Sequence, residues 1–161
     1  MHESCSSCPP VVGDVEASVG YCWPVRVYYE DTDAGGVVYH ATYLNYMERA
    51  RTEWLRALGY AQEALVRERG ILFAVHRLSV DYLYPARLDD QLCVRVGALK
   101  IRRASMEFSQ QIQSKCASYP RLLTRATVKI ACLAAKNMTP CPIPDPILDA
   151  FHTWENRRCE C

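Results

Sequence analysis

An acidic, glycine-rich segment early in the chain combines the residue types that hydrolysis of a carbonyl compound requires. Asp31 and Asp33 precede the pair Gly35-Gly36, and His40 stands where an amphipathic helix begins. Adjacent glycines let backbone amides approach a ligand closely and adopt positive φ angles. The helix start presents unpaired N–H groups and the positive end of its dipole. An aspartate ahead of such a helix can face a polarised carbonyl, which indicates a hydrolase; the structural alternative is that both aspartates only satisfy turn backbone.

The composition of the 161-residue chain excludes several classes of protein. A formal net charge of +1 creates no broad field for nucleic acid or an anionic membrane, so we expect no nucleic-acid partner. The longest small-apolar run, at 130–135, is far too short to span a bilayer, so we expect no transmembrane segment. The N-terminus lacks a basic start followed by an apolar core and is not a secretory signal. One cytoplasmic domain is the prediction.

The nine cysteines argue against a disulfide framework because their number is odd and no secretory signal accompanies them. Cys22, Cys93 and Cys132 lie in or beside apolar strand-like runs, where a reduced cysteine acts as a small hydrophobe. The terminal Cys-x-x-Cys and Cys-x-Cys pairs lack the spacing of two zinc knuckles. We therefore expect reduced thiols and no metal site.

The hydrophobic pattern changes from helical spacing before residue 70 to strict alternation after it. The predicted order is a strand at 25–29, a long helix at 44–58, a short helix at 62–69, strands at 71–84, 92–96, 106–112 and 122–132, and a short helix at 147–154. We expect a disordered extension at 1–20, one domain at 21–154 and a tail at 155–161.

This order predicts an α+β fold in which one antiparallel sheet carries its helices on one face. The other face and the sheet edges are then left uncovered. The strands are too apolar for an open face, so the sequence predicts self-association.

Four stretches of the chain carry a family resemblance, at 25–43, 46–55, 80–82 and 85–90. The first reads Val-Arg-Val-Tyr-Tyr-Glu-Asp-Thr-Asp-Ala-Gly-Gly-Val-Val-Tyr-His-Ala-Thr-Tyr, and a Glu-Arg-Ala-Arg helix follows it. This sequence resembles the hot-dog-fold acyl-CoA thioesterases, within the 4-hydroxybenzoyl-CoA thioesterase-like family and its Tol–Pal-associated type. The resemblance implies a long central helix packed on a curved antiparallel five-stranded sheet. It also implies hydrolysis of an acyl-CoA in a homodimer or homotetramer with sites between subunits, without metal or bound cofactor, since CoA is part of the substrate.

The resemblance assigns roles to individual residues. The family's catalytic acid matches Asp33, which would activate a water as general base or attack the carbonyl itself as nucleophile. The backbone N–H at His40 would polarise the thioester carbonyl, and the His40 ring either contacts the substrate or packs for structure. Glu48 is the rival acid, because a related hot-dog branch carries its carboxylate on this helix, and we count it among the substrate-binding residues. Its structural alternative is an ion pair with Arg51.

The remaining candidates would bind the two ends of the substrate. Tyr39 and Tyr43 flank the acidic segment and line an acyl or aryl pocket, or else belong to the ordinary core. Lys100, Arg102 and Arg103 stand together at a strand connection, where they meet the CoA phosphates or form a solvated loop.

Two other functions stay open on the sequence. A hot-dog domain can bind acyl chains without turnover, but such a module would be expected to lose the acid that Asp33 retains. A thioesterase can also act on acyl carrier protein, whose acidic surface would suit the basic cluster. The sequence does not define the length of the acyl chain.

Overall fold

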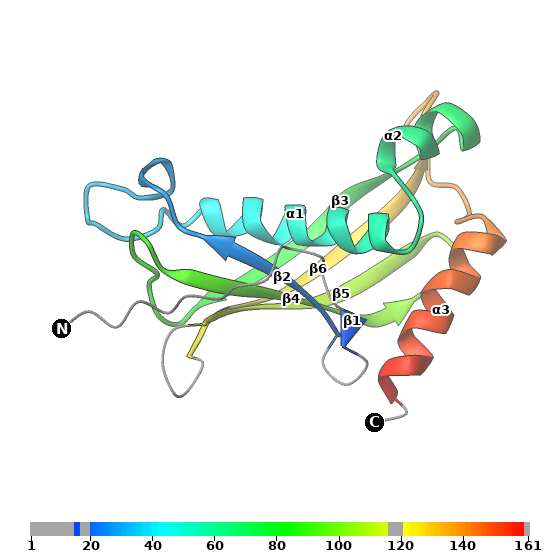
Figure 1. The fold of residues 1–161 in the computed structure, drawn as a ribbon. Helices are drawn as coiled ribbons and strands as arrows, with labels where there is room; N and C mark the ends of the chain where they lie inside the picture. The colour runs from blue at the N-terminus through cyan, green and yellow to red at the C-terminus, as the bar shows by residue number, and fades with distance from the viewer. Residues whose placement is uncertain (1–14, 17–19, 116–120, 160–161) are drawn as a thin grey trace.

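The computed structural model describes residues 15–16, 20–115 and 121–159 (Figure 1). Its strands are β1 (Val15–Glu16), β2 (Gly20–Arg26), β3 (Ile71–Tyr82), β4 (Gln91–Ile101), β5 (Ser105–Ser114) and β6 (Leu122–Ala134). Its helices are α1 (Thr42–Ala57), α2 (Gln62–Ala64) and α3 (Asp145–Cys159), with a 3-10 turn η1 (Tyr29–Asp31) and a π-helical turn η2 (Leu65–Arg69).

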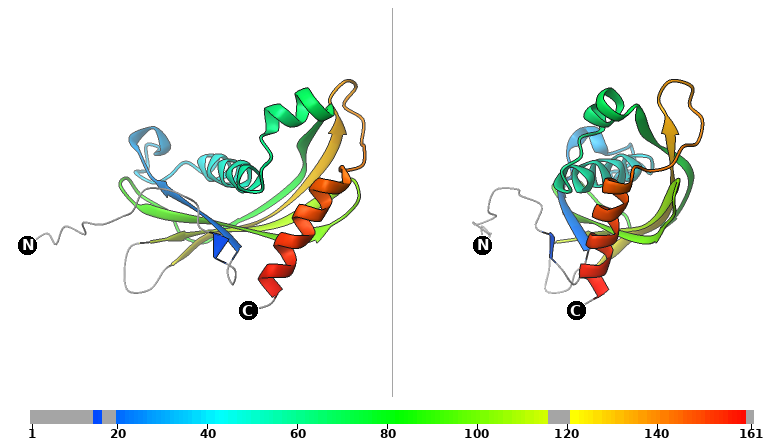
Figure 2. Two further views of the ribbon diagram at one scale, coloured as in Figure 1. Left: turned by 45° about the vertical axis from the view of Figure 1, so that its right-hand side comes forward. Right: turned by 90° about the vertical axis from the view of Figure 1, so that its right-hand side faces the viewer.

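The strands form one antiparallel sheet in the order β1-β2-β4-β5-β6-β3, and α1 lies along its concave side (Figure 1). Figure 2 shows the sheet curving around this helix. The predicted α+β architecture, a long helix packed on a curved antiparallel sheet, is therefore confirmed. The two-residue β1 adds a sixth strand to the five that were expected.

The long helix forms where apolar residues recur on one side of it. Tyr43, Met47, Ala50 and Trp54 are buried, and they share one core with sheet residues that include Phe108. The Trp54 ring stacks on Phe151 of α3, with ring centroids 5.1 Å apart. The helix thus joins the sheet to α3 and holds its own N-terminal end over one end of the sheet.

The first strand differs from its prediction, because β2 ends at Arg26 and does not continue to Tyr29. The Tyr28 N–H donates to the Asp31 Oδ2 at 2.8 Å, and the Asp31 N–H donates to the Tyr28 carbonyl oxygen. These two bonds close η1, so the side chain of Asp31 competes with the sheet for the backbone of this stretch.

The last helix is longer than predicted, since α3 extends from Asp145 through Cys159 and takes in most of the expected tail. Most of the predicted extension at 1–20 lies outside the described residues, although residues 15–16 and 20 belong to the sheet. Among the described residues, no helix combines the length and the apolar character needed to cross a membrane.

The convex face of the sheet is polar, which corrects the expectation that apolar residues would occupy it. One row of directly opposed residues crosses this face as Lys100, Glu107, Lys129 and Arg77. Residues opposite each other in a sheet point to the same face. The buried residues, such as Phe108, take the alternate positions and face α1. Exposed apolar side chains lie instead on β3, where Val75 and Leu78 are 53% and 39% exposed.

Two cysteines also depart from the prediction of reduced thiols, because Cys22 and Cys93 form a disulfide. β2 and β4 are neighbours in which Cys22 lies opposite Arg95 and Pro24 opposite Cys93. This register places the two cysteines diagonally on one face with a Cα–Cα distance of 6.0 Å, within the usual range for a disulfide. The pairing joins residues 71 positions apart, so it follows from strand register and not from cysteine number.

Candidate active site

The acidic segment folds into a tight turn between β2 and α1. The Asp33 N–H donates to the Val37 carbonyl oxygen, and the Gly36 N–H donates to the Asp33 carbonyl oxygen, both at 3.0 Å. Gly36 has a φ of +70°, the left-handed conformation that glycine adopts without strain. The Gly35 N–H donates to the Asp33 Oδ1 at 2.8 Å, and a Cβ at Gly35 would lie 3.0 Å from that oxygen. Both glycines therefore shape the turn that holds Asp33.

The two aspartates of this segment have different environments. Asp31 is 7% exposed, and its Oδ2 accepts the Tyr28 N–H. Burial, and then the neighbouring Asp31 carboxylate, raise the pKa of the Tyr46 hydroxyl on α1. Asp33 is exposed, and only its Oδ1 has a protein donor among the described residues. Asp31 thus fixes the turn against the helix, and Asp33 has the carboxylate that a substrate can reach.

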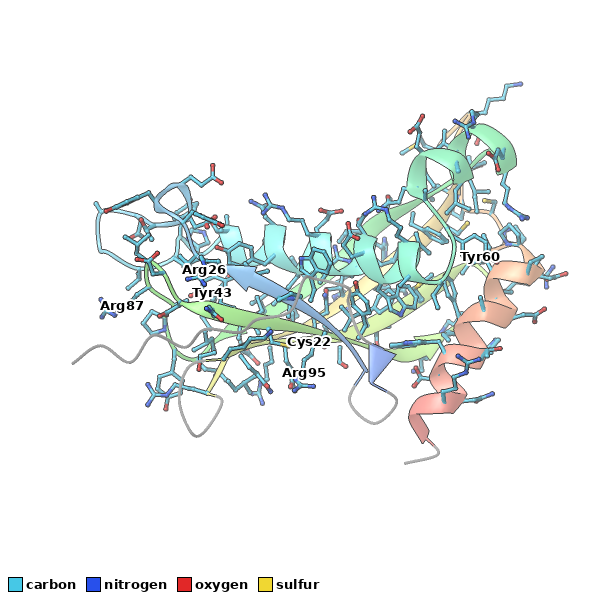
Figure 3. The ribbon with its side chains drawn as sticks, in the orientation of Figure 1. Cys22, Arg26, Tyr43, Tyr60, Arg87 and Arg95 are labelled. Atoms are coloured by element: carbon cyan, nitrogen blue, oxygen red, sulfur yellow. A yellow bond between two sulfur atoms is a disulfide. The ribbon has the colours of Figure 1, made fainter. Side chains whose placement is uncertain are left out.

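A cavity of about 310 Å³ adjoins Asp33, and we call it the Asp33 cavity. Its wall includes Asp33, His40 and Tyr43, together with Tyr82 at the end of β3 and the residues that follow it. Tyr43 is buried at the start of α1, and its hydroxyl accepts the Ala86 N–H at 2.8 Å. In Figure 3, Tyr43 lies at the end of the sheet near Arg26 and Arg87. The structure therefore brings together three of the predicted site residues.

The start of α1 supplies open N–H groups beside this cavity, which His40 lines. The helix begins at Thr42, and no side chain caps its N-terminus. The Tyr39 N–H donates to the Asp31 carbonyl oxygen and the Thr42 N–H to the Tyr39 carbonyl oxygen, whereas the N–H groups of His40 and Ala41 have no protein acceptor within the described residues. Such groups carry the positive end of the helix dipole and can bind a developing oxyanion.

Tyr82 is a site residue that the sequence reasoning missed. Its hydroxyl donates to the His40 carbonyl oxygen at 2.9 Å, and its ring meets the His40 ring edge-on with centroids 6.4 Å apart. Its ring also contacts Tyr43. The Val-Asp-Tyr stretch that carries part of the family resemblance was the available signal, but sequence alone does not show that the end of β3 meets the start of α1.

Tyr39 and Glu48 lie outside this cavity. Tyr39 is exposed, and its ring lies against the His40 ring at a centroid distance of 4.4 Å. Glu48 lines a different cavity farther along α1, where its Oε1 accepts the Thr52 hydroxyl at 2.7 Å. The alternative of a Glu48–Arg51 ion pair was wrong, because Arg51 donates instead to Gln110.

The basic cluster lies at the opposite end of the sheet from Asp33. Gln91 of β4 pairs with Arg26, beside the acidic segment, and Lys100 is farther along the same strand. At about 3.3 Å per residue, the intervening stretch spans about 30 Å. Arg103 lies 3.9 Å from the Asp145 carboxylate. Within one chain, therefore, Lys100, Arg102 and Arg103 do not reach the Asp33 cavity.

No group of three or more metal-ligating side chains occurs within the described ranges. The remaining close sulfur pair there is Cys132 and Cys141, whose Sγ atoms are 3.7 Å apart. Burial, and then a contact with Cys141, raise the pKa of Cys132 to about 12, so this thiol stays protonated at neutral pH. The question of zinc at Cys5 and Cys8 concerns residues outside the described ranges.

Comparison with known proteins defines the class. The family model for the thioesterase-like superfamily matches residues 27–151. The acyl-CoA thioesterase YbgC of Haemophilus influenzae is 45% identical over 133 residues, which cover 83% of this chain and 95% of the relative. The acyl-CoA thioester hydrolase YbgC of Escherichia coli O6:H1 is 46% identical over 129 residues, covering 80% and 93%.

Solved structures agree with this assignment. A probable thioesterase from Bartonella henselae superimposes with a TM-score of 0.70 at 31% identity, over 76% of this chain and 98% of that one. A DHNA-CoA thioesterase from Staphylococcus aureus shares the fold, with a TM-score of 0.77 at 21% identity over 86% and 93% of the two chains. The chain belongs to the thioesterase-like superfamily. The resemblance to hot-dog acyl-CoA thioesterases is confirmed, and with it the expected enzyme class, thioester hydrolase.

Proposed function

We propose that this chain hydrolyses acyl-CoA thioesters at the Asp33 cavity, with Asp33 as the catalytic acid. The observation that carries this proposal is that an exposed Asp33 carboxylate and the uncapped start of α1 border one cavity. The thioester carbonyl oxygen would accept the His40 N–H while its carbon faces Asp33. The nucleophile and the oxyanion donors then approach the same carbonyl from separate elements.

The reaction has two routes that use the same groups. With Asp33 as base, a water attacks the carbonyl carbon and gives its proton to the carboxylate, the carbon–sulfur bond breaks, and the CoA thiolate takes up the proton. With Asp33 as nucleophile, the carboxylate attacks the carbonyl carbon, the carbon–sulfur bond breaks, and CoA leaves as the thiolate. Water then hydrolyses the resulting anhydride, which releases the free acid and restores the Asp33 carboxylate, and the CoA thiolate takes up the proton that the water gives. In both routes, negative charge develops on the carbonyl oxygen, where the N–H groups of His40 and Ala41 stabilise it.

The proposed enzyme is a homodimer that forms through β3, or a homotetramer built from such dimers. β3 is twelve residues long, lies at the sheet edge and pairs only with β6 among the described residues. Its helix-facing residues continue past α1, so Val75, Leu78 and Tyr82 stay exposed. A long apolar edge strand is a template for pairing with another chain. Two copies pairing antiparallel at β3 form a closed two-fold dimer.

This dimer accounts for the distant basic cluster. Antiparallel pairing sets the Tyr82 end of one β3 beside the Ile71 end of the other, and the β4–β5 connection lies at the Ile71 end of the sheet. Lys100, Arg102 and Arg103 of one subunit would then lie at the same end of the dimer as the Asp33 cavity of the other, with Lys100 on the convex face. The CoA phosphates are the ligands we propose for them.

A thioester on an acyl carrier protein is the alternative substrate. The convex face presents Lys100, Lys129 and Arg77 in one row with a single acid, Glu107, and basic surfaces favour acidic carriers. For either substrate we propose a cytoplasmic location, because these thioesters are made and used inside the cell.

The test is release of free CoA from a panel of acetyl-, butanoyl-, octanoyl-, palmitoyl- and benzoyl-CoA, followed with a thiol-reactive dye. We expect turnover of at least one ester by the purified protein and none above background by Asp33→Asn. If no acyl-CoA is hydrolysed, and no acyl group is hydrolysed from acyl carrier protein either, the proposed hydrolase is refuted.

A further inference from the structure

Two free thiols lie in contact where the chain turns back from β6 toward α3. Cys132 belongs to β6 and Cys141 to the returning segment, and their Sγ atoms are 3.7 Å apart. A disulfide bond is about 2.05 Å long, so the two sulfurs are within about 2 Å of bonding distance. Neither cysteine lines the Asp33 cavity, so the proposed hydrolysis leaves this pair without a role.

The backbone holds the two cysteines directly opposite each other. The neighbouring residues Leu133 and Pro140 form an antiparallel bridge. The Cys141 N–H donates to the Cys132 carbonyl oxygen at 3.0 Å. Residues opposed at a hydrogen-bonded position of an antiparallel pair have Cα atoms about 5.5 Å apart and side chains on the same face. Disulfides most often have Cα–Cα distances of about 5.5–6 Å, so the backbone here already has the separation that a disulfide requires.

The two thiols differ in their access to solvent. Cys132 is 0% exposed, whereas Cys141 is half-buried. The raised pKa of Cys132 keeps that thiol protonated, and a protonated thiol is a poor nucleophile. An oxidant that arrives from solvent therefore reacts with Cys141, and Cys132 lies beside the oxidised sulfur. An accessible cysteine next to a second cysteine that can resolve it is the usual arrangement of a redox-sensitive pair.

We propose that Cys132 and Cys141 form a reversible oxidation site whose reactant is a hydroperoxide. The Cys141 thiol loses its proton, and its sulfur attacks the outer oxygen of the hydroperoxide, whose oxygen–oxygen bond breaks. The leaving oxygen takes up the proton as water or an alcohol, and Cys141 becomes a sulfenic acid. The Cys132 sulfur then attacks the Cys141 sulfur, the sulfur–oxygen bond breaks, and the Cys132 proton leaves with the hydroxyl group as water. The two thiols are thereby oxidised to one disulfide, and the hydroperoxide is reduced.

The new disulfide would tie β6 to the segment that leads into α3. The returning segment ends shortly before Asp145, where α3 begins, and Phe151 of α3 stacks on Trp54 of α1. A cross-link between residues close in sequence removes conformational freedom from the unfolded chain. We therefore expect the oxidised protein to resist unfolding better than the reduced protein.

The competing explanation is that the two thiols only fill space as small apolar groups. Peptide mapping separates the two explanations, because cleavage after lysine and arginine places Cys132 on peptide 130–136 and Cys141 on peptide 137–157. The wild-type protein is treated with hydrogen peroxide, its remaining thiols are alkylated in denaturant, and it is then digested with trypsin.

We expect a species with the summed mass of the two peptides less two hydrogen atoms. Dithiothreitol added before alkylation should abolish this species, because a disulfide is reversible. Two separately alkylated peptides after peroxide treatment would overturn the proposal. A sulfinic acid on Cys141 beside an alkylated Cys132 would also overturn it, since that product means that Cys132 does not resolve the sulfenic acid.

Urea unfolding, followed by tryptophan fluorescence, tests the effect on α3, because Trp54 lies against Trp154 with ring centroids 5.3 Å apart. Peroxide treatment should shift the unfolding midpoint of the wild type to higher urea and leave that of Cys141→Ser unchanged. The Cys22–Cys93 disulfide is common to both proteins and does not contribute to the difference. An unchanged midpoint in the wild type, or an equal shift in Cys141→Ser, would contradict the proposed tie.

Discussion

The phenolic hydroxyl of Tyr82, at the end of edge strand β3, donates a hydrogen bond to the backbone carbonyl oxygen of His40 at 2.9 Å. The His40 carbonyl and the Ala41 N–H belong to one planar peptide unit. Holding the carbonyl therefore fixes the direction of the Ala41 N–H at the start of α1. A residue of β3 in this way sets the orientation of one of the two proposed oxyanion donors.

Replacing Tyr82 by Phe should lower kcat and leave KM nearly unchanged, because the ring still lines the cavity and only the hydrogen bond is lost. A bond of about 1 kcal/mol corresponds to a factor of about 5 in rate. Steady-state kinetics with one acyl-CoA check this. Tyr60→Phe is the control, since the Tyr60 hydroxyl donates to the Pro146 carbonyl oxygen at 3.1 Å and Tyr60 does not line the Asp33 cavity. An unchanged kcat in Tyr82→Phe would show that the bond has no role in turnover.

The two glycines of the acidic turn should respond differently to alanine. A Cβ at Gly35 meets the Asp33 Oδ1 at 3.0 Å and displaces the carboxylate, so kcat should fall about tenfold with little loss of stability. A Cβ at Gly36 meets nothing within 4 Å, but the φ of +70° makes the alanine strained by roughly 1 kcal/mol. Kinetics and urea unfolding of both variants separate the effects. A loss of stability in Gly35→Ala together with a fall in kcat in Gly36→Ala would mean that the turn does not hold Asp33 as described.

Local pattern predicted the parts of the site that are close in sequence. Asp33, Gly35 and His40 lie within one turn and one helix start, so their spacing already placed them together. Tyr82 joins them only through the packing of β3 beside α1, which no short-range signal encodes. Asp31 is 7% exposed and bonds the Tyr28 N–H, so the structural alternative of an aspartate that satisfies turn backbone holds for Asp31.

Long-range register explains what the sequence reasoning missed. The Cys22–Cys93 disulfide depends on how β2 pairs with β4, and the polar convex face depends on which alternate residues of four strands point away from α1. Periodicity shows that a strand has two faces, but it does not show which face the helix covers. The same argument applies to Arg51, whose partner Gln110 comes from β5 and not from the next turn of its own helix.

The proposed dimer should depend on the exposed apolar residues of β3. Leu78→Asp places a carboxylate at the centre of the interface in both subunits, so the dimer dissociation constant should rise at least about 10²-fold. Thr127→Asp on the polar convex face is the control and should leave it unchanged. Analytical ultracentrifugation at several concentrations measures both. A wild-type protein that is monomeric and fully active would exclude the β3 dimer.

The basic cluster should contribute to binding of CoA and not to the chemical step. Alanine at Lys100, Arg102 and Arg103 together should raise KM for acyl-CoA several-fold with little change in kcat, because contacts far from the carbonyl act equally on ground and transition states. A truncated thioester without the nucleotide should show no such change. Added salt should raise KM of the wild type more than that of the variant. Equal KM values of the wild type and the triple variant for full acyl-CoA would show that the CoA phosphates bind to other residues.

The most direct test of Asp33 as the catalytic acid compares kcat of Asp33→Asn with that of Glu48→Gln, on one acyl-CoA and with folding checked by circular dichroism. Both changes replace a carboxylate by an amide of nearly the same shape, on residues that line different cavities. We expect Asp33→Asn to lower kcat at least about 10²-fold, the scale for loss of a general base, and Glu48→Gln to cost much less. A mild effect of Asp33→Asn together with loss of turnover in Glu48→Gln would contradict the assignment and move the chemistry to Glu48 on α1.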